Sequence, residues 1–377
     1  MKFDYDVIRD PEVFAIRRLR AHSDHAWYRD EAGEQDGKIL LNGDWKFRYS
    51  ENISSAPKGF EREGYDDSGW DTIPVPSHME LQGYGHPQYL NVTYPWDGVE
   101  TVLPGEVPSR FNPTGSYIRE VSLVLTDEPV YLCFHGVESA FALWVNGTFA
   151  GYSEDSFTPA EFEITPFVRD GKNKIAVQVY RFSSGSWLED QDFFRFSGIF
   201  RDVVLYTKPA CHLEDLFVRT TLEENNTKAL ISLSLRYEYL RMSEANDFCA
   251  EYRVYSPDGK ELVRFTKPVE GRPALNETVS AETLTTPDVY TQQLSIKLEQ
   301  PLLWSAENPR LYTLKIFIRH LDADGKTTGL VEQIVQKVGI RTFSLQNGIM
   351  ELNGRRIVFK GVNRHEFCAH SGRSLPY

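Results

Sequence analysis

Residues 231–239 read Ile-Ser-Leu-Ser-Leu-Arg-Tyr-Glu-Tyr, a run in which every second side chain is large and apolar. Successive side chains of a β-strand point to opposite faces of a sheet, so this pattern predicts a strand with one buried and one wetted face. The same alternation recurs in residues 175–179 and 314–318. Because one-sided burial is typical of antiparallel sheets, the chain is expected to be mainly β.

Turn signals separate these runs. Asn-Gly and Asp-Gly pairs favour tight hairpin turns, and they begin at Asn42, Asn146, Asp170, Asp258, Asp324 and Asn353. Many short strands with frequent turns predict β-sandwiches. The main helical signal is Pro11 between Asp10 and Glu12, which predicts one helical turn before residues 13–20.

Two boundaries are expected, one near Lys208-Pro209 and one between the strand around Val335 and the turn at Asn347-Gly348. The middle piece, about 130 residues long, fits an immunoglobulin-like sandwich. The first piece, about 200 residues long, is large for a single sandwich, and its first 40 or so residues look irregular.

The segment after the second boundary predicts the beginning of a catalytic barrel. Residues 350–360 read as a hairpin that turns at Asn353-Gly354. The strand 357–359 would then deliver residues 363–366, Asn-Arg-His-Glu, at its carboxyl end, where parallel barrels place their chemistry. A barrel needs about 250 residues. The chain is therefore expected to be the non-catalytic front of a larger enzyme.

Composition excludes several classes of function. The net charge of −13 argues against a nucleic-acid partner, because phosphate binding needs clustered Lys and Arg. No apolar run is long enough to span a membrane, and the acidic N-terminus is no secretory signal. The scattered cysteines, which lack metal-binding spacing, fit reduced thiols in a cytoplasmic protein: Cys133, Cys211, Cys249 and Cys368.

Three segments are candidates for function. Residues 89–96, Tyr-Leu-Asn-Val-Thr-Tyr-Pro-Trp, form a loop that is either functional or simply packed on the sandwich. In the segment 186–202, three carboxylates lie between bulky aromatic residues: Glu189, Asp190 and Asp192. Such acids need a cation or a partner such as Arg195 or Arg201, and both readings stay open. His365 is either structural or, at a barrel strand end, functional.

These segments resemble the large β-galactosidases of glycoside hydrolase family 2. Four stretches occur in the family's order and approximate spacing: 91–95, 188–192, 197–202 and 361–366. Residues 303–309 also resemble the family's middle domain. Related glucuronidases and mannosidases share the architecture, but the Asn91 and Asp192 segments are similar to the galactosidase branch.

The resemblance implies four regions along the chain. They are an irregular leader at 1–40, a jelly-roll-like sugar-binding sandwich at 41–208, an immunoglobulin-like β-sandwich at 209–341, and the first strand of a truncated TIM barrel at 342–377.

The resemblance also implies site residues. Asn91 and Val92 would reach the galactose pocket, Asp192 would bind a galactosyl hydroxyl and a sodium ion, and His365 would contact the sugar near the transition state. The family retains configuration with one Glu as acid/base and another as nucleophile. Both lie beyond Tyr377, as does most of the magnesium shell of the active site.

Two features depart from the family pattern. Phe367 stands where the family often has a second histidine. Some members hold a structural magnesium near the leader, for which the candidates here are Asp10, the Val13 carbonyl and Glu154, but Ser184 stands where those members have an acid. The leader in some members helps to assemble a tetramer, so the full-length protein is expected to be a homo-oligomer.

Two hypotheses follow. In the first, the chain is the front of a β-galactosidase that cleaves terminal β-galactosides such as lactose, and these residues alone are inactive. In the second, the chain is a carbohydrate-binding module or a subunit complemented by a separate chain. A related family 2 glycosidase, a glucuronidase or mannosidase, is a further alternative. A lone barrel strand leaves an exposed edge, so activity from these residues alone is not expected.

Overall fold

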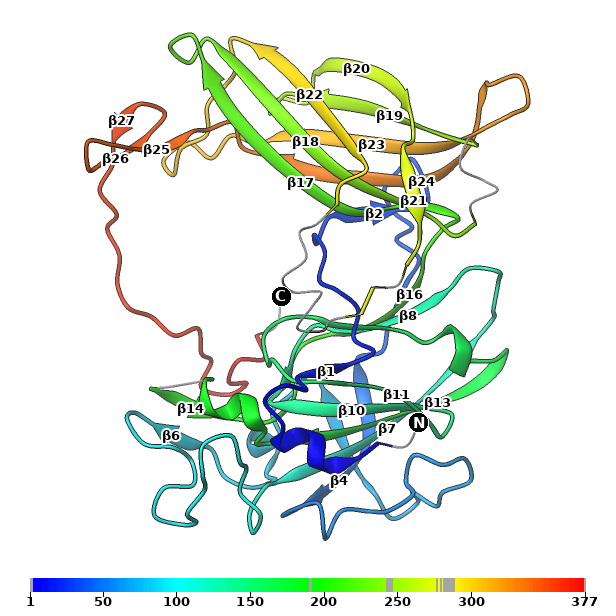
Figure 1. Ribbon diagram of the computed structural model, residues 1–377, viewed down its shortest axis with the longest axis vertical. Coiled ribbons are helices and arrows are strands. Elements are labelled where there is room, and N and C mark those ends of the chain that lie inside the picture. The colour runs from blue at the N-terminus through cyan, green and yellow to red at the C-terminus, as the bar shows by residue number, and fades with distance from the viewer. Residues whose placement is uncertain are drawn as a thin grey trace.

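The computed structural model describes residues 3–189, 192–241, 247–275, 277–278, 280 and 289–375. Figure 1 shows two β-sandwiches, one above the other, with the N-terminal segment running between them. The helical pieces in the described residues are short 3-10 turns: η1 Tyr5–Arg9, η2 Glu80–Gln82, η3 Thr165–Phe167 and η4 Ser184–Trp187. None of these is long and apolar enough to cross a membrane. The prediction of a mainly β chain is confirmed.

The lower sandwich in Figure 1 faces a seven-stranded sheet against a four-stranded sheet. The larger sheet has the order β1 Ala15–Ile16, β11 Thr148–Ser153, β10 Ala140–Val145, β13 Gly171–Tyr180, β7 Thr114–Leu123, β4 Gly43–Ser50 and β5 Asp71–Val75. The smaller sheet has the order β12 Ala160–Glu163, β8 Val130–Phe134, β16 Val203–Thr207 and β3 Lys38–Leu40.

One hydrophobic core lies between these two sheets. Leu143 and Val177 of the larger sheet and Leu132 of the smaller sheet are fully buried within it. Trp45 is also fully buried, and its indole Nε1–H donates to the Leu41 carbonyl at 2.9 Å. A buried indole needs such a partner, so the hydrogen bond fixes the start of β4 in the core.

The upper sandwich contains the strand from which the sequence pattern was read. One sheet pairs β17 Cys211–Glu223, β18 Lys228–Tyr239, β21 Gly271–Pro273 and β22 Gln292–Glu299. The other has the order β2 Ala26–Tyr28, β24 Thr327–Val338, β23 Tyr312–Leu321, β19 Phe248–Tyr255 and β20 Glu261–Pro268. The apolar positions of β18 are buried as predicted. Tyr237 Oη lies 2.9 Å from Tyr252 Oη, so these buried hydroxyls satisfy each other between the sheets.

The leader is more ordered than the expected irregular segment. It places β1 at the edge of the seven-stranded sheet, β3 at the edge of the four-stranded sheet, and β2 beside β24 in the upper sandwich. The 3-10 turn η1 ends at Arg9, before Pro11, whereas the helical turn was expected to start at Asp10. Residues 15–16 are extended because β11 offers them an open edge.

The hairpin near the C-terminus is only partly as predicted. β26 Ile349–Leu352 pairs with β25 Phe343–Gln346 and with β27 Arg355–Arg356. Asn353 and Gly354 turn with φ of 54° and 74°, the positive values that an Asn-Gly turn accommodates. Residues 357–359 do not form the expected barrel strand in this structure: the Ile357 N–H donates to the Met350 carbonyl of β26 at 2.9 Å, and no further strand pairing follows in the described residues. The segment instead runs extended from the hairpin down to β14 Phe193–Arg195 of the lower sandwich (Figure 1).

Buried charges join the two sandwiches and the leader around a cavity of about 340 Å³. Lys208, at the junction, lies 3.5 Å from Glu161 of the lower sandwich and 2.6 Å from Glu214 of the upper sandwich. His22 of the leader lies 3.1 Å from the other oxygen of Glu161. Burial lowers the pKa of His22, but the hydrogen bond with Glu161 and the negative charges of Glu161 and Glu214 together outweigh it and raise the pKa to about 9. Burial raises the pKa of Glu161, but Lys208 and His22 together lower it to about 2.

Glu332 of β24 lines the same cavity. Its carboxylate accepts the backbone N–H of Leu213 at 2.9 Å and is 3% exposed. Burial raises the pKa of Glu332 to about 7, which the nearby His212 and the Leu213 amide only partly oppose. This acid therefore titrates near neutral pH at the junction between the sandwiches.

Replacing Glu332 with glutamine is expected to flatten the dependence of stability on pH. The folded-state pKa of about 7 lies above the ordinary value of 4.5, so the contribution of Glu332 to stability is present below about pH 4.5 and is lost as pH rises through 7. The full difference corresponds to about 3 kcal/mol. Glutamine can still accept the Leu213 N–H.

Urea unfolding at about pH 5 and about pH 8 measures this effect. The exposed Glu299 of β22 supplies the control, Glu299→Gln, which should keep the profile of the wild type. Identical pH profiles in the wild type and Glu332→Gln would contradict the assignment.

Candidate functional site

A short antiparallel ladder brings the two predicted substrate-binding segments together. β6 Gln88–Leu90 pairs with β14 so that Leu90 lies opposite Phe193 and Tyr89 lies opposite Phe194. Asn91 follows β6 directly and Asp192 precedes β14 directly, so the antiparallel register places them at the same end of the ladder. Both are exposed, as is Val92, which is 91% exposed.

Tyr89 holds the Asp192 carboxylate. Its Oη donates a hydrogen bond of 2.7 Å to Asp192 Oδ1, and this bond raises the pKa of Tyr89. No arginine or lysine in the described ranges pairs with Asp192, whose φ is 58°. Sequence reasoning missed this role of Tyr89. The available signal for this role was strand alternation. Tyr89 and Leu90 are neighbours in a strand and face opposite sides, so the burial of Leu90 leaves Tyr89 exposed.

Neither of the arginines proposed as alternative partners pairs with the Asp192 carboxylate in the described residues. Arg195 is 2% exposed and donates to the carbonyl oxygens of Ser186 and Glu189. Arg201 donates to the Phe157 carbonyl at 2.7 Å. The Glu189 carboxylate accepts the backbone N–H and the hydroxyl of Ser156, both at 2.9 Å. Asp190, the third acid of the predicted cluster, lies outside the described residues.

Stacked aromatic rings fix the Asn91 loop. Tyr94 and Trp96 are parallel at 5.4 Å, and Trp187 packs against them at 4.5 and 4.9 Å. The Trp187 Nε1–H donates to the Glu106 carbonyl at 2.7 Å. The loop that bears Asn91 is therefore attached to η4, which precedes the acid-rich segment.

His365 reaches the same ladder from the C-terminal segment. Its ring stacks on Phe193 with 4.5 Å between centroids and 24° between planes. Phe367 stacks on Phe194 at 5.1 Å. Phe193 follows Asp192 directly, so the structure brings Asn91, Asp192 and His365 to one edge of the lower sandwich.

A cleft of about 890 Å³ opens beside this edge. Phe193, His365 and Glu366 line it, together with Arg201 and Arg373. Asn91, Val92 and Asp192 are not among its lining residues, so they lie beyond its rim. The described residues thus form one wall of a site, with aromatic rings and polar side chains, and the acids Asp24, Asp202 and Glu366 also line the cleft.

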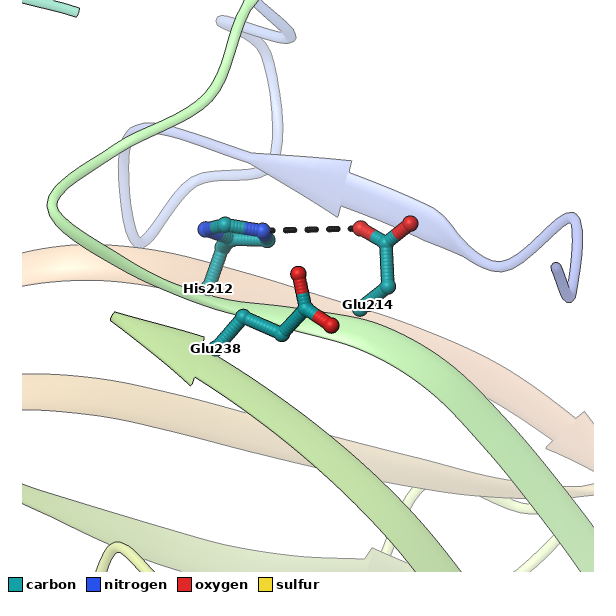
Figure 2. Close-up of side chains that lie close together, drawn as sticks. All are labelled: His212, Glu214 and Glu238. Atoms are coloured by element: carbon teal, nitrogen blue, oxygen red, sulfur yellow. Dashed lines mark ion pairs between the residues drawn. The ribbon is translucent and has the colours of Figure 1, made fainter. Parts of the chain in front are cut away.

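A second cluster has the residue types of a metal site, and Figure 2 draws it. Ligand atoms of His212, Glu214 and Glu238 lie within 4.8 Å of one another, with His212 Nε2 at 3.4 Å from Glu214. However, Lys208 contacts Glu214 at 2.6 Å, and Arg272 donates to Glu238 at 2.9 and 3.0 Å. Because these cations already balance the carboxylates, the cluster acts as an ion-pair network and does not favour a dication.

The structural magnesium site near the leader does not fit these residues. Glu154 is 4% exposed and accepts hydrogen bonds from Tyr152, Ser183, Ser184 and the Gly185 N–H at 2.6 to 3.1 Å. Burial raises the pKa of Glu154. Asp10 instead accepts the backbone N–H of Glu12 at 3.0 Å. Hydroxyl and amide donors thus take the places at Glu154 that a cation would need.

Comparison with known proteins covers nearly the whole chain. Residues 39–209 match the model "Glycosyl hydrolases family 2, sugar binding domain", residues 211–341 match "Glycosyl hydrolases family 2", and residues 343–377 match "Glycosyl hydrolases family 2, TIM barrel domain". The three models together leave out only the N-terminal segment and single residues between them.

Curated relatives share this assignment. The chain is 45% identical to a β-galactosidase of Halalkalibacterium halodurans over 97% of this chain and 34% of the relative. A β-galactosidase large subunit of Leuconostoc lactis is 35% identical over 100% of this chain and 58% of the relative. The chain thus spans about a third of the length of the first of these relatives.

Solved structures agree on the fold. The β-glucuronidase of Bacteroides uniformis has a TM-score of 0.68 at 22% identity, over 90% of this chain and 36% of that one. The two sandwiches and the three consecutive domain matches lead to one assignment: the chain belongs to glycoside hydrolase family 2.

Proposed function

We propose that the protein containing these residues is a retaining β-galactosidase that hydrolyses terminal β-D-galactosides such as lactose. The observation that carries the proposal is the β6–β14 register, which sets Asn91 beside Asp192. Asn91 and Val92 would reach into the galactose pocket, Asp192 would bind a galactosyl hydroxyl, and His365 would meet the sugar at the transition state. Identities of 45% and 43% to β-galactosidases of Halalkalibacterium halodurans and Priestia megaterium support this substrate class.

The division of labour between domains belongs to the same proposal. The segments 1–40, 41–208, 209–341 and 342–377 would be the leader, the sugar-binding sandwich, the immunoglobulin-like sandwich and the start of the barrel. By the family resemblance, both catalytic glutamates would lie outside residues 1–377. Residues 1–377 alone are therefore expected to be inactive, and a cytoplasmic homo-oligomer is expected for the whole protein.

Sodium is the proposed ion at Asp192. The side chain is exposed, Tyr89 occupies Oδ1, and Oδ2 has no hydrogen-bond partner in the described part of the chain. An open carboxylate oxygen suits a hard cation. The sodium would help to orient the galactosyl hydroxyls, with its remaining ligands supplied from outside these residues. The active-site magnesium of the family would be held by residues that this chain does not contain.

A two-chain enzyme is the second candidate. The relatives from Leuconostoc lactis, Lactobacillus helveticus and Latilactobacillus sakei are each named a β-galactosidase large subunit. Phe343, Leu345, Val358 and Phe359 are more than half exposed, which supports an apolar surface covered by further polypeptide. In that case activity would need a separate small subunit.

Hydrolysis of chromogenic substrates tests the proposal. The full-length gene product, alone and with any adjacent small subunit, should cleave a β-galactoside far faster than a β-glucuronide, with turnover of about 1 to 1,000 per second. Residues 1–377 alone serve as the inactive reference. Preference for the glucuronide would contradict the proposal.

Asp192→Ala in the full-length enzyme is expected to raise the KM for the galactoside and to abolish the dependence of activity on sodium. The carboxylate supplies the charge that holds the ion, and its loss leaves β6 and β14 paired through the backbone. Asp66→Ala is the matched control, because Asp66 is an exposed aspartate in a turn with Ser68. Equal sodium titrations for the wild type and Asp192→Ala would make Asp192 a purely structural residue.

His365→Ala is expected to lower kcat by about 100-fold or more while changing KM much less. A group that meets the sugar in the transition state acts on the rate constant. The exposed His370 in the same segment supplies the control, His370→Ala. A rise in KM with unchanged kcat would instead make His365 a ground-state binding residue.

A further inference from the structure

The residues after His365 return to the lower sandwich and enter it. The Arg373 guanidinium lies 2.9 Å from the Glu138 carboxylate, and the two side chains are 7% and 0% exposed. Arg373 Nη2 also donates to the Phe194 carbonyl at 2.9 Å. Its backbone N–H donates to His78 Nε2 at 3.1 Å. A segment whose earlier part is exposed thus ends in a buried ion pair.

Glu138 connects this ion pair to β14. Its Oε1 accepts the backbone N–H of Phe196, and its strand β9 Val137–Glu138 pairs with β15 Gly198–Ile199. Arg373 therefore contacts the chain just after β14 through Glu138 and contacts β14 itself through Phe194. A fully buried carboxylate that loses a cationic partner is strongly destabilised, so the pair resists separation.

Arg373 and His365 contact the same aromatic ring. The Arg373 guanidinium carbon lies 4.3 Å from the centroid of Phe193, and the His365 ring lies 4.5 Å from it. Guanidinium groups bind favourably over aromatic faces. Phe193 is thereby the physical link between the buried arginine and the exposed histidine.

A tight turn lies between His365 and Arg373 in the chain. Cys368 and Gly372 exchange two backbone hydrogen bonds of 2.8 Å. Gly372 has a φ of 63°, and a Cβ there would lie 2.8 Å from His78. The turn thus needs glycine, and it delivers Arg373 into the sandwich beside His78.

We propose that Arg373 is a positioning residue for His365. Through Glu138 and Phe193, it fixes the segment 365–373 to the sugar-binding sandwich, so that His365 stays at the edge that bears Asp192. The effect of Arg373 on catalysis rests on the proposed function. The anchor itself, defined as the Arg373–Glu138 pair with Phe193, is independent of which sugar is bound.

Kinetics of the full-length enzyme test the catalytic consequence. Arg373→Gln is expected to lower kcat on the order of 10- to 100-fold with a smaller change in KM, because a displacement of about 1 Å has that effect. Arg373→Lys should restore part of the rate, since it keeps the charge. Arg169→Gln is the matched control, because the Arg169–Glu63 pair is exposed on the surface.

A double-mutant cycle separates positioning from general destabilisation. If Arg373 acts through His365, the combination of Arg373→Gln with His365→Ala should lower kcat little more than His365→Ala alone. Fully additive effects on kcat would overturn the proposal, as would an unchanged kcat in Arg373→Gln.

Hydrogen exchange of the 377-residue chain tests the anchor without any activity. The amides of Cys368, Gly372 and Arg373 should lose protection in Arg373→Gln and Glu138→Gln but not in Arg169→Gln. Unchanged protection would overturn the anchor. A full-length enzyme without β-galactosidase activity would overturn the proposed function and the catalytic role of Arg373, while the exchange data would still decide on the anchor.

Discussion

The alternation of side chains across antiparallel strands is the constraint on which the rest of this structure depends. A shift of one residue in a strand pair would move every apolar side chain of β18 to the solvent face, so burial fixes the register. The same rule operates in the small β6–β14 ladder, where Leu90 and Phe193 are buried opposite each other. Packing of two apolar residues therefore determines which polar residues, Asn91 and Asp192, meet at the end of the ladder.

Charge is the second organising force, and it lies where two sandwiches and the leader meet. Lys208 contacts a glutamate from each sandwich, and His22 adds a third segment to the network. Buried ions are costly unless they are paired, so a change in the angle between the sandwiches would separate these charges from their partners at a cost in free energy. Ion pairs and hydrogen bonds require particular distances and directions, whereas apolar contacts alone would let the two sandwiches slide against each other. The geometry of these ion pairs therefore specifies the orientation of the sandwiches more than the apolar area buried between them does.

Local patterns in the sequence predicted the strands and turns well and the long-range contacts poorly. The alternation in 231–239 and the Asn353-Gly354 turn are properties of adjacent residues. The turn and the burial of the apolar positions were confirmed, but Arg236 and Glu238, on the face expected to be wet, are buried as well. The run 357–359 has strand-forming side chains, but beyond the hydrogen bond from the Ile357 N–H to Met350 the described residues offer it no further strand pairing. Arg373 and Glu138 are 235 positions apart, so no spacing rule could pair them. The prediction that Asn91 and Asp192 belong to one site came from the family resemblance and not from a pattern in the residues themselves.

The leader has a consequence for biosynthesis. Ala26 of β2 pairs with Val335 of β24, so about 300 residues must be translated before β2 can find its partner strand. At about 5 to 20 residues per second, this interval lasts on the order of 15 to 60 s. During that time β1 and β3 can already pair with strands of the lower sandwich, while β2 between them, which contains Trp27, has no partner strand yet. The part of the chain that is made early is therefore completed late.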